Sequence, residues 1–134
     1  MKECFVPIEV CKKLAAKGYD GKRNGKYVEK IPGTEREEWD DDEMMWYDVT
    51  DVKTTPRIHI YDALKWLREV KGIDILPQRG HIDLDSNGKA TRYYNVNIYF
   101  ERRFACTLDN DEQDYSTYEQ AAIAGIEYVL DNLI

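Results

Sequence analysis

Apolar side chains recur at helical spacing in three segments of the chain, residues 7–17, 60–70 and 116–134. Glycines stand just beyond the first two segments, at Gly18 and Gly72, where they are typical of helix ends. The stripe of the first segment is Ile8, Cys11, Leu14 and Ala15. The stripe of the second is Ile60, Ala63, Leu64, Leu67 and Val70, with Trp66 beside it. The pattern predicts three amphipathic helices.

The third helix is expected to lie flat on a sheet. Ser116 is placed to cap its first turn, and Glu119, three residues later, would complete a capping box. Its apolar residues form one broad stripe, consisting of Ala122, Ile123, Ile126, Val129, Leu130, Leu133 and Ile134. Gly125 lies in the same segment, and because it has no side chain, it would let a strand approach the helix closely.

The strongest strand pattern is residues 93–100, where apolar and polar side chains alternate. The even-numbered side chains are expected to face the core, and these are Tyr94, Val96, Ile98 and Phe100. The same parity continues at Phe104, Cys106 and Leu108, after a break at residues 101–103. This continuation predicts either one long bent strand or a second strand.

Two weaker strands are expected in the first half of the chain, at residues 27–31 and 44–52. Between them, residues 34–43 are polar and strongly acidic, which favours a solvated loop or insert. The chain has 134 residues, the length of one ordinary domain. We therefore predict a single α+β domain over residues 1–134, with one antiparallel sheet and three helices, two of them packed on its apolar face.

One short segment resembles the first half of a calcium loop. Asp83, Asp85, Asn87 and Gly88 match its first ligand positions and its glycine, but the twelfth position is Tyr94, where a bidentate glutamate is required. Asn-Gly between two alternating segments is a strong hairpin signal, because both residues tolerate the positive φ angles of a type I′ turn. The sequence therefore favours a turn over a metal site.

A second acidic cluster precedes the last helix and contains Asp109, Asp111 and Asp114. Negative charge is favourable near the start of a helix, which is a sufficient explanation for this cluster. It could form a cation site with Asp83 and Asp85 only if the two loops meet in space. We expect no bound metal at either place.

Charge is distributed unevenly along the chain, whose formal net charge is −7. Residues 35–51 hold nine acidic side chains and one basic side chain. A net negative field repels nucleic acid, so a nucleic-acid partner is disfavoured. The alternative function is a nucleic-acid-associated or DNA-mimicking protein, which would require a continuous acidic face or a basic stripe. The candidates for that stripe are Lys65, Arg68, Arg92, Arg102 and Arg103.

Membrane insertion and catalysis both lack support in the sequence. No apolar run is long enough for a signal segment or a transmembrane helix, which favours a cytoplasmic protein with no membrane partner. The three cysteines form no CxxC pair, so Cys4, Cys11 and Cys106 are expected to be small buried apolar residues. The catalytic candidates are Cys106 with His59 or His81, or a pair of Asp residues, but their spacing supports no catalysis. We therefore expect a non-enzymatic protein without a cofactor.

The acidic segment is the best candidate for an interaction site. It embeds one tryptophan among carboxylates and continues into Met and aromatic residues, which are enriched at protein interfaces. The candidate residues are Trp39, Asp40, Asp41, Asp42, Glu43 and Trp46. An acidic surface of this kind would suit a basic protein partner. The competing interpretation is a solvated loop whose Trp46 packs into the domain.

Three segments of the chain resemble small uncharacterised proteins of phages and integrated mobile elements of gut bacteria. They are Phe5-Val6-Pro7-Ile8-Glu9 with the following residues to Asp20, then residues 63–69, and then Tyr115-Ser116-Thr117-Tyr118-Glu119-Gln120-Ala121 with the helix that follows. The resemblance implies a mobile-element origin and a cytoplasmic setting, and it implies no activity. The chain departs from the group at His59 and in its acidic insert around Trp39. Our leading hypothesis is an accessory protein of a mobile element that binds another protein.

Overall fold

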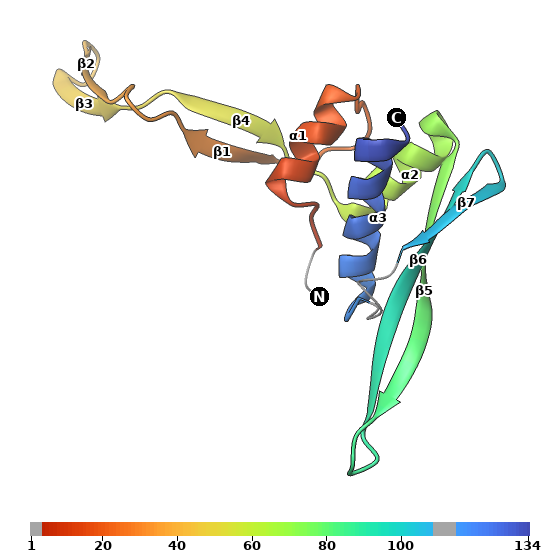
Figure 1. The fold of residues 1–134 in the computed structure, drawn as a ribbon. Coiled ribbons are helices and arrows are strands. Elements are labelled where there is room, and N and C mark those ends of the chain that lie inside the picture. Colours follow the sequence, from red (N-terminus) through yellow and green to blue (C-terminus); the bar gives the residue numbers. More distant parts are fainter. Residues whose placement is uncertain (1–3, 109–114) are drawn as a thin grey trace.

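In the part of the chain that the structure describes, the helices α1 (Ile8–Ala16), α2 (Ile60–Lys71) and α3 (Tyr118–Asn132) gather at the centre of the molecule, and two β-ribbons extend from them in different directions (Figure 1). The structure is a computed structural model that describes residues 4–108 and 115–134. The predicted α+β fold and its three helices are confirmed. Among the described residues, no helix is both long enough and apolar enough to cross a membrane.

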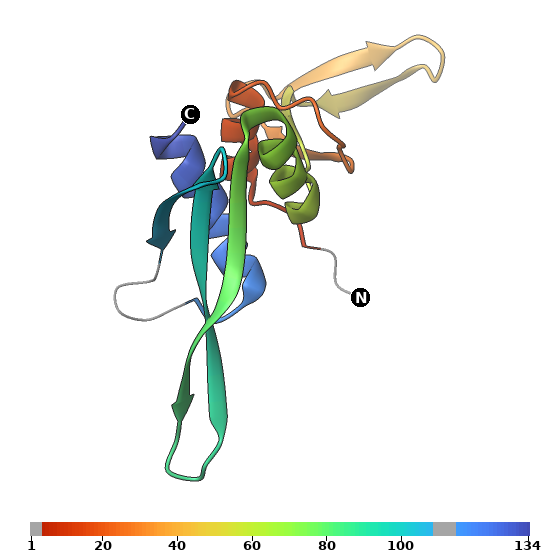
Figure 2. The same ribbon diagram turned by 90° about the vertical axis from the view of Figure 1, so that its right-hand side faces the viewer.

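The first ribbon belongs to a three-stranded antiparallel sheet with the strand order β5-β6-β7. Its strands are β5 (Ile73–Leu84), β6 (Ala90–Phe100) and β7 (Arg103–Leu108). Helix α2 packs on β5 and helix α3 packs on β5 and β6, as predicted for two helices on a sheet. The β5–β6 pair then runs on past the ends of the helices, as Figure 2 shows. Most of β5 was not predicted, because its segment contains Pro77 and lacks a regular alternation.

The second ribbon is built from four short strands and is separate from that sheet. Strands β1 (Lys26–Lys30) and β4 (Val52–Pro56) pair close to the helices, and β2 (Arg36–Asp40) and β3 (Met45–Val49) pair at the far end (Figure 1). The prediction of a loop over residues 34–43 was wrong, because β2 lies within that segment. Its charge correctly indicated exposure to water, but charge alone does not determine backbone conformation.

The core lies between the three helices and one face of β5 and β6. Val96 and Ile98 are fully buried and Tyr94 is half-buried, as the alternation predicts, but Phe100 is 41% exposed. Phe104 is 61% exposed, although its parity predicted burial. Phe104 is exposed because the pairing of β6 with β7 is irregular between Ile98 and Tyr99. The register shifts beyond that point, so Phe104 pairs with Tyr99 and faces away from the core.

The buried faces of the first two helices differ slightly from the predicted stripes. In α1, Val10 is buried in place of Ala15. In α2, Trp66 is buried and Val70 is 55% exposed. The indole of Trp66 donates a hydrogen bond to Asp20 Oδ1 at 2.7 Å, and this contact holds the ring between α2 and the loop that follows α1. The buried face of α2 thus includes the large side chain of Trp66 and leaves Val70 outside it.

Helix α3 lies directly against the sheet. A Cβ atom at Gly125 would lie 2.5 Å from Ile75 Cγ2 and 3.0 Å from Val96 Cγ1, which confirms the predicted close approach. The predicted cap was wrong by one residue, because Thr117 rather than Ser116 caps the helix. Its hydroxyl accepts a hydrogen bond from the backbone N–H of Gln120 at 3.1 Å.

The calcium-like segment reverses the chain between β5 and β6, as predicted, but in another type of turn. Gly88 has a φ of 78°, whereas Asn87 has no positive φ, so the turn is not type I′. Asp85 Oδ1 instead accepts hydrogen bonds from the backbone N–H groups of Asn87 and Lys89, both at 2.9 Å. Asp85 therefore has a structural role, because its carboxylate holds the backbone of the turn in place.

The break predicted at residues 101–103 is a two-residue connection between β6 and β7. Its residues, Glu101 and Arg102, have φ angles of 48° and 67°. Two consecutive residues in the left-handed region are the signature of a tight hairpin turn. Neither residue is glycine, so the predicted bend is a hairpin whose sequence gave no turn signal.

Candidate functional site

The candidate site is the hairpin formed by β2 and β3, at the outer end of the second ribbon (Figure 1). Trp39 and Trp46 lie directly opposite each other in its register. Their ring centroids are 5.6 Å apart at an interplanar angle of 63°, an edge-to-face arrangement. Trp39 is 46% exposed and Trp46 is 60% exposed. The alternative in which Trp46 packs into the domain is therefore wrong.

Two of the predicted site residues accept hydrogen bonds at the turn end of this hairpin. Asp40 Oδ1 accepts hydrogen bonds from the backbone N–H groups of Asp42 and Glu43, at 2.9 and 3.2 Å. Asp41 Oδ1 accepts a hydrogen bond from Trp39 Nε1 at 2.6 Å. Asp40 therefore shapes the turn, and Asp41 orients an indole, so both side chains already have structural roles.

Glu43 is also engaged within the hairpin. Its carboxylate accepts a hydrogen bond from the hydroxyl of Tyr47, and this bond raises the pKa of Tyr47 above its ordinary value. Among the six predicted residues, this leaves the carboxylate of Asp42 without a hydrogen bond or an ion pair to the rest of the described chain.

The two faces of the hairpin differ in how their carboxylates are used. On the face opposite the tryptophans, Glu38 pairs with Arg36, and Asp40 is engaged in the turn. On the face that carries Trp39 and Trp46, Glu37 and Asp48 stand directly opposite each other, two pairs of residues further from the turn. Neither carboxylate forms a hydrogen bond or an ion pair with any described residue.

We call the surface formed by Trp39, Trp46, Glu37 and Asp48 the tryptophan face. Next to its two carboxylates lies an open hollow of about 450 Å³, lined by Glu35, Arg36, Glu37, Asp48, Val49 and Thr50. Glu35, Glu37 and Asp48 were not among the predicted site residues. A strand assignment for residues 36–40 would have placed Glu37 on the side of Trp39, because side chains alternate along a strand. Asp48 could be added only from the register of the hairpin.

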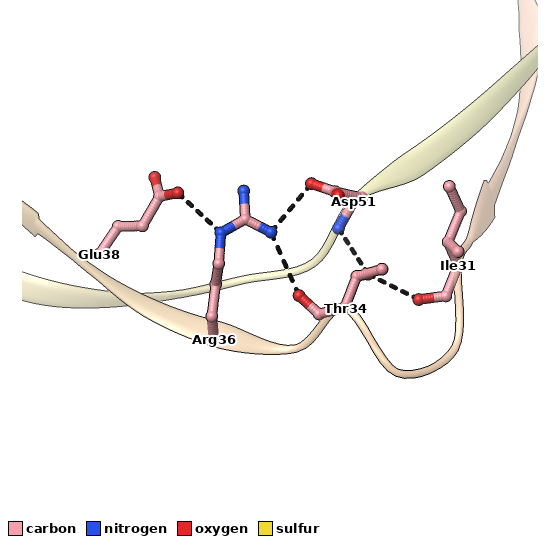
Figure 3. Close-up of polar contacts among 5 residues, drawn as sticks. All are labelled: Ile31, Thr34, Arg36, Glu38 and Asp51. Carbon is pink, nitrogen blue, oxygen red and sulfur yellow. Dashed lines mark hydrogen bonds and ion pairs between the residues drawn. The ribbon is translucent and has the colours of Figure 1, made fainter.

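The hairpin is joined to the inner part of the ribbon by Arg36, whose contacts Figure 3 shows. Its guanidinium donates to Glu38 Oε1 at 2.8 Å and to Asp51 Oδ1 at 2.9 Å, and it also reaches the carbonyl oxygen of Thr34 at 3.2 Å. The contact with Asp51, followed by that with Glu38, raises the pKa of Arg36 above its ordinary value. The guanidinium thus links β2 to Asp51, the residue just before β4.

Thr34 completes this joint on the other side (Figure 3). Its hydroxyl donates to the carbonyl oxygen of Ile31 at 2.7 Å and accepts from the backbone N–H of Asp51 at 3.0 Å. Five residues connect β1 to β2, but only two connect β3 to β4. The Thr34 and Arg36 contacts therefore fix the direction of the ribbon at a point where regular pairing is interrupted.

The candidate catalytic residues take other roles. His59 caps α2, and its Nδ1 accepts a hydrogen bond from the backbone N–H of Tyr61 at 3.2 Å. Cys106 lies on β7, where its contact raises the pKa of the Tyr128 hydroxyl. The side chain of His81 lies outside the described part of the structure. Cys11 is fully buried, which raises its pKa and fits the predicted apolar role.

Neither cation hypothesis gains support from the structure. Within residues 4–108 and 115–134, no group of three or more His, Cys, Asp or Glu side chains could hold a metal ion. The cluster with Asp109, Asp111 and Asp114 lies outside the described residues.

The proposed basic stripe is interrupted by acidic side chains. Arg68 and Arg102 line a common hollow, but Asp74 and Glu101 line it as well. The side chain of Arg92 is outside the described part of the structure. Mixed charge at this surface gives little attraction for a phosphate backbone.

Comparisons with known proteins give no relative: no protein-family model matches the chain, and no curated protein or solved structure is significantly similar to it.

Proposed function

We propose that this chain is a non-enzymatic accessory protein of a mobile element and that it binds another protein through the β2–β3 hairpin. The observation that carries the proposal is the exposed pair of Trp39 and Trp46. Keeping two indoles in water forgoes the free energy of burying them. Tryptophan is also among the residues most enriched in the energetic centres of protein interfaces.

The scaffold of the hairpin supports a binding role. Asp41 orients Trp39, Asp40 closes the turn, and Arg36 fixes the hairpin on its ribbon. Side chains that are already held in position lose less conformational entropy when a partner binds. The site also stands away from the helices, at the end of a ribbon, where a partner can approach it from several directions (Figure 1).

The charge of the hairpin favours a basic partner. Residues 35–51 hold nine acidic side chains and one basic side chain. Such a field accelerates association with a positively charged surface and repels acidic proteins. The mobile-element setting and the cytoplasmic location rest on the resemblance of three segments to phage and mobile-element proteins.

Affinity capture from a lysate of a gut bacterium, followed by mass spectrometry, tests this proposal. We expect the wild-type chain to retain a basic protein that the Trp39→Ala/Trp46→Ala variant loses. Phe104→Ala is the matched control, since Phe104 is an exposed aromatic residue outside the hairpin. This control should retain the same protein. Raising the salt concentration should weaken the capture of that protein by the wild-type chain. A partner that both variants retain, or no specific partner at all, would refute the proposal.

A further inference from the structure

The tryptophan face contains two like charges whose carboxylates have no partner among the described residues. Glu37 and Asp48 are cross-strand neighbours, and two carboxylates placed directly opposite each other destabilise a ribbon. Neither is engaged by any other described residue. A cation that bound between them would relieve this repulsion, and the open hollow beside them gives it access.

The other face of the same hairpin already contains such a cation. There the guanidinium of Arg36 bridges the carboxylates of Glu38 and Asp51, at 2.8 and 2.9 Å (Figure 3). The chain thus satisfies two carboxylates on one face with its own arginine. It supplies no equivalent side chain to Glu37 and Asp48 within the described residues.

We infer that the tryptophan face binds an arginine side chain of a partner protein, with its guanidinium between Glu37 and Asp48 and its flat surface against an indole. This inference rests on the proposed function and names the chemistry of the partner. A guanidinium fits better than an ammonium, because its planar fork can donate to two carboxylates at once and can stack on an aromatic ring. A metal ion fits less well, since the described side chains form no metal-binding group.

The experiment is a titration of the full chain with short peptides, followed by NMR of the indole N–H groups. The probe is a five-residue peptide with two arginines separated by one glycine, and lysine and citrulline versions of it are compared. Trp39 and Trp46 report on the face, whereas Trp66 is buried, bonds to Asp20 and serves as an internal reference. We expect the arginine peptide to shift the Trp39 and Trp46 signals and to leave the Trp66 signal in place.

Binding should depend on the shape of the charged group of the peptide as well as on its charge. We expect the citrulline peptide to lose binding and the lysine peptide to bind at least about threefold more weakly than the arginine peptide. Glu37→Gln or Asp48→Asn should weaken binding about fivefold or more. Asp42→Asn is the matched control, because it removes one unengaged carboxylate of the same hairpin that does not line the hollow. It should weaken binding less than about twofold.

Several outcomes would overturn the inference. One is an equal loss of peptide affinity for Glu37→Gln and Asp42→Asn, and another is equal affinity for the lysine and arginine peptides. The others are unchanged indole N–H signals of Trp39 and Trp46 on adding the arginine peptide, and the same signal shifts produced by Ca²⁺ alone. An unchanged Trp66 signal verifies that each variant is folded. If the capture experiment still depends on Trp39 and Trp46 while the peptide results fail, the proposed function stands and the arginine pocket does not.

Discussion

Gly125 sets the distance between α3 and the sheet. The closest neighbour of a Cβ atom at this position would be Ile75 Cγ2, at 2.5 Å, which is far inside van der Waals contact. Ile75 and Val96 are buried between the helix and the strands, so neither has room to move away. Glycine in a helix interior is unfavourable in itself. Its presence here therefore reflects packing rather than local propensity.

Replacing this glycine tests that conclusion. We expect Gly125→Ala to lower the free energy of unfolding by about 1–2 kcal/mol, because overpacking costs more than the gain in helix propensity returns. Urea denaturation followed by circular dichroism measures this change. In an Ile75→Ala background the clashing methyl group is absent, so the same substitution should be nearly neutral or stabilising. Equal losses in the two backgrounds would show that Ile75 does not limit position 125.

The hairpin of β2 and β3 depends on its joint for order. An isolated two-stranded hairpin is marginally stable in water, and within residues 4–108 and 115–134 this one has neither a third strand nor a helix on either side. Its cohesion comes from the Trp39–Trp46 contact, the turn closed by Asp40, and the bonds of Arg36. Arg36 is exposed, so its contribution should be local and small compared with the stability of the core.

Removing this guanidinium should therefore loosen the hairpin and leave the rest of the chain unchanged. For Arg36→Ala we expect the backbone amides of residues 37–48 to exchange with solvent roughly two- to fivefold faster, with no change in α3. Hydrogen–deuterium exchange with mass spectrometry measures both regions at once. Arg79→Ala removes an exposed arginine from the other ribbon and is the control. Unchanged exchange in the hairpin would mean that its strand pairing and its tryptophans are sufficient.

The helices were predictable from the sequence, whereas the hairpin was not. Helical periodicity depends on residues three or four positions apart, so α1, α2 and α3 leave a local signal. Apolar and polar residues do not alternate along β2, because both of its faces are exposed to solvent. The position of Trp39 opposite Trp46 depends on register, which the turn at residues 41–44 sets. Glu37 and Asp48 could not be recognised as a pair until that register was known.

The molecule divides its tasks between a core and a projecting ribbon. Among the described residues, no member of the hydrophobic core lies between Tyr19 and Ile58. The second ribbon begins and ends within that interval, and only Tyr27 of it packs against the core from the side. The stability of the chain should therefore come almost entirely from the three helices and from strands β5 and β6.

Deleting the outer hairpin tests this division. We expect a chain in which Asn-Gly replaces residues 32–50 to fold, with its unfolding midpoint within about 5 °C of the wild-type value. The joint contact between the Ile31 N–H and the Asp51 carbonyl, 2.8 Å long, would then close a short hairpin. Thermal denaturation followed by circular dichroism measures the midpoint. For comparison, Leu67→Ala, which truncates a fully buried side chain, should cost about 2–5 kcal/mol.

The same deletion should change how the folded chain behaves in solution. It removes eight acidic residues and one basic residue from a chain of net charge −7, and so leaves no net charge at neutral pH. We expect lower solubility near pH 7, because self-repulsion between molecules is lost. Precipitation with ammonium sulfate compares the two chains. A shortened chain that fails to fold would show that the acidic hairpin is part of the folding unit, whereas one that folds and loses its basic partner would locate binding in the hairpin.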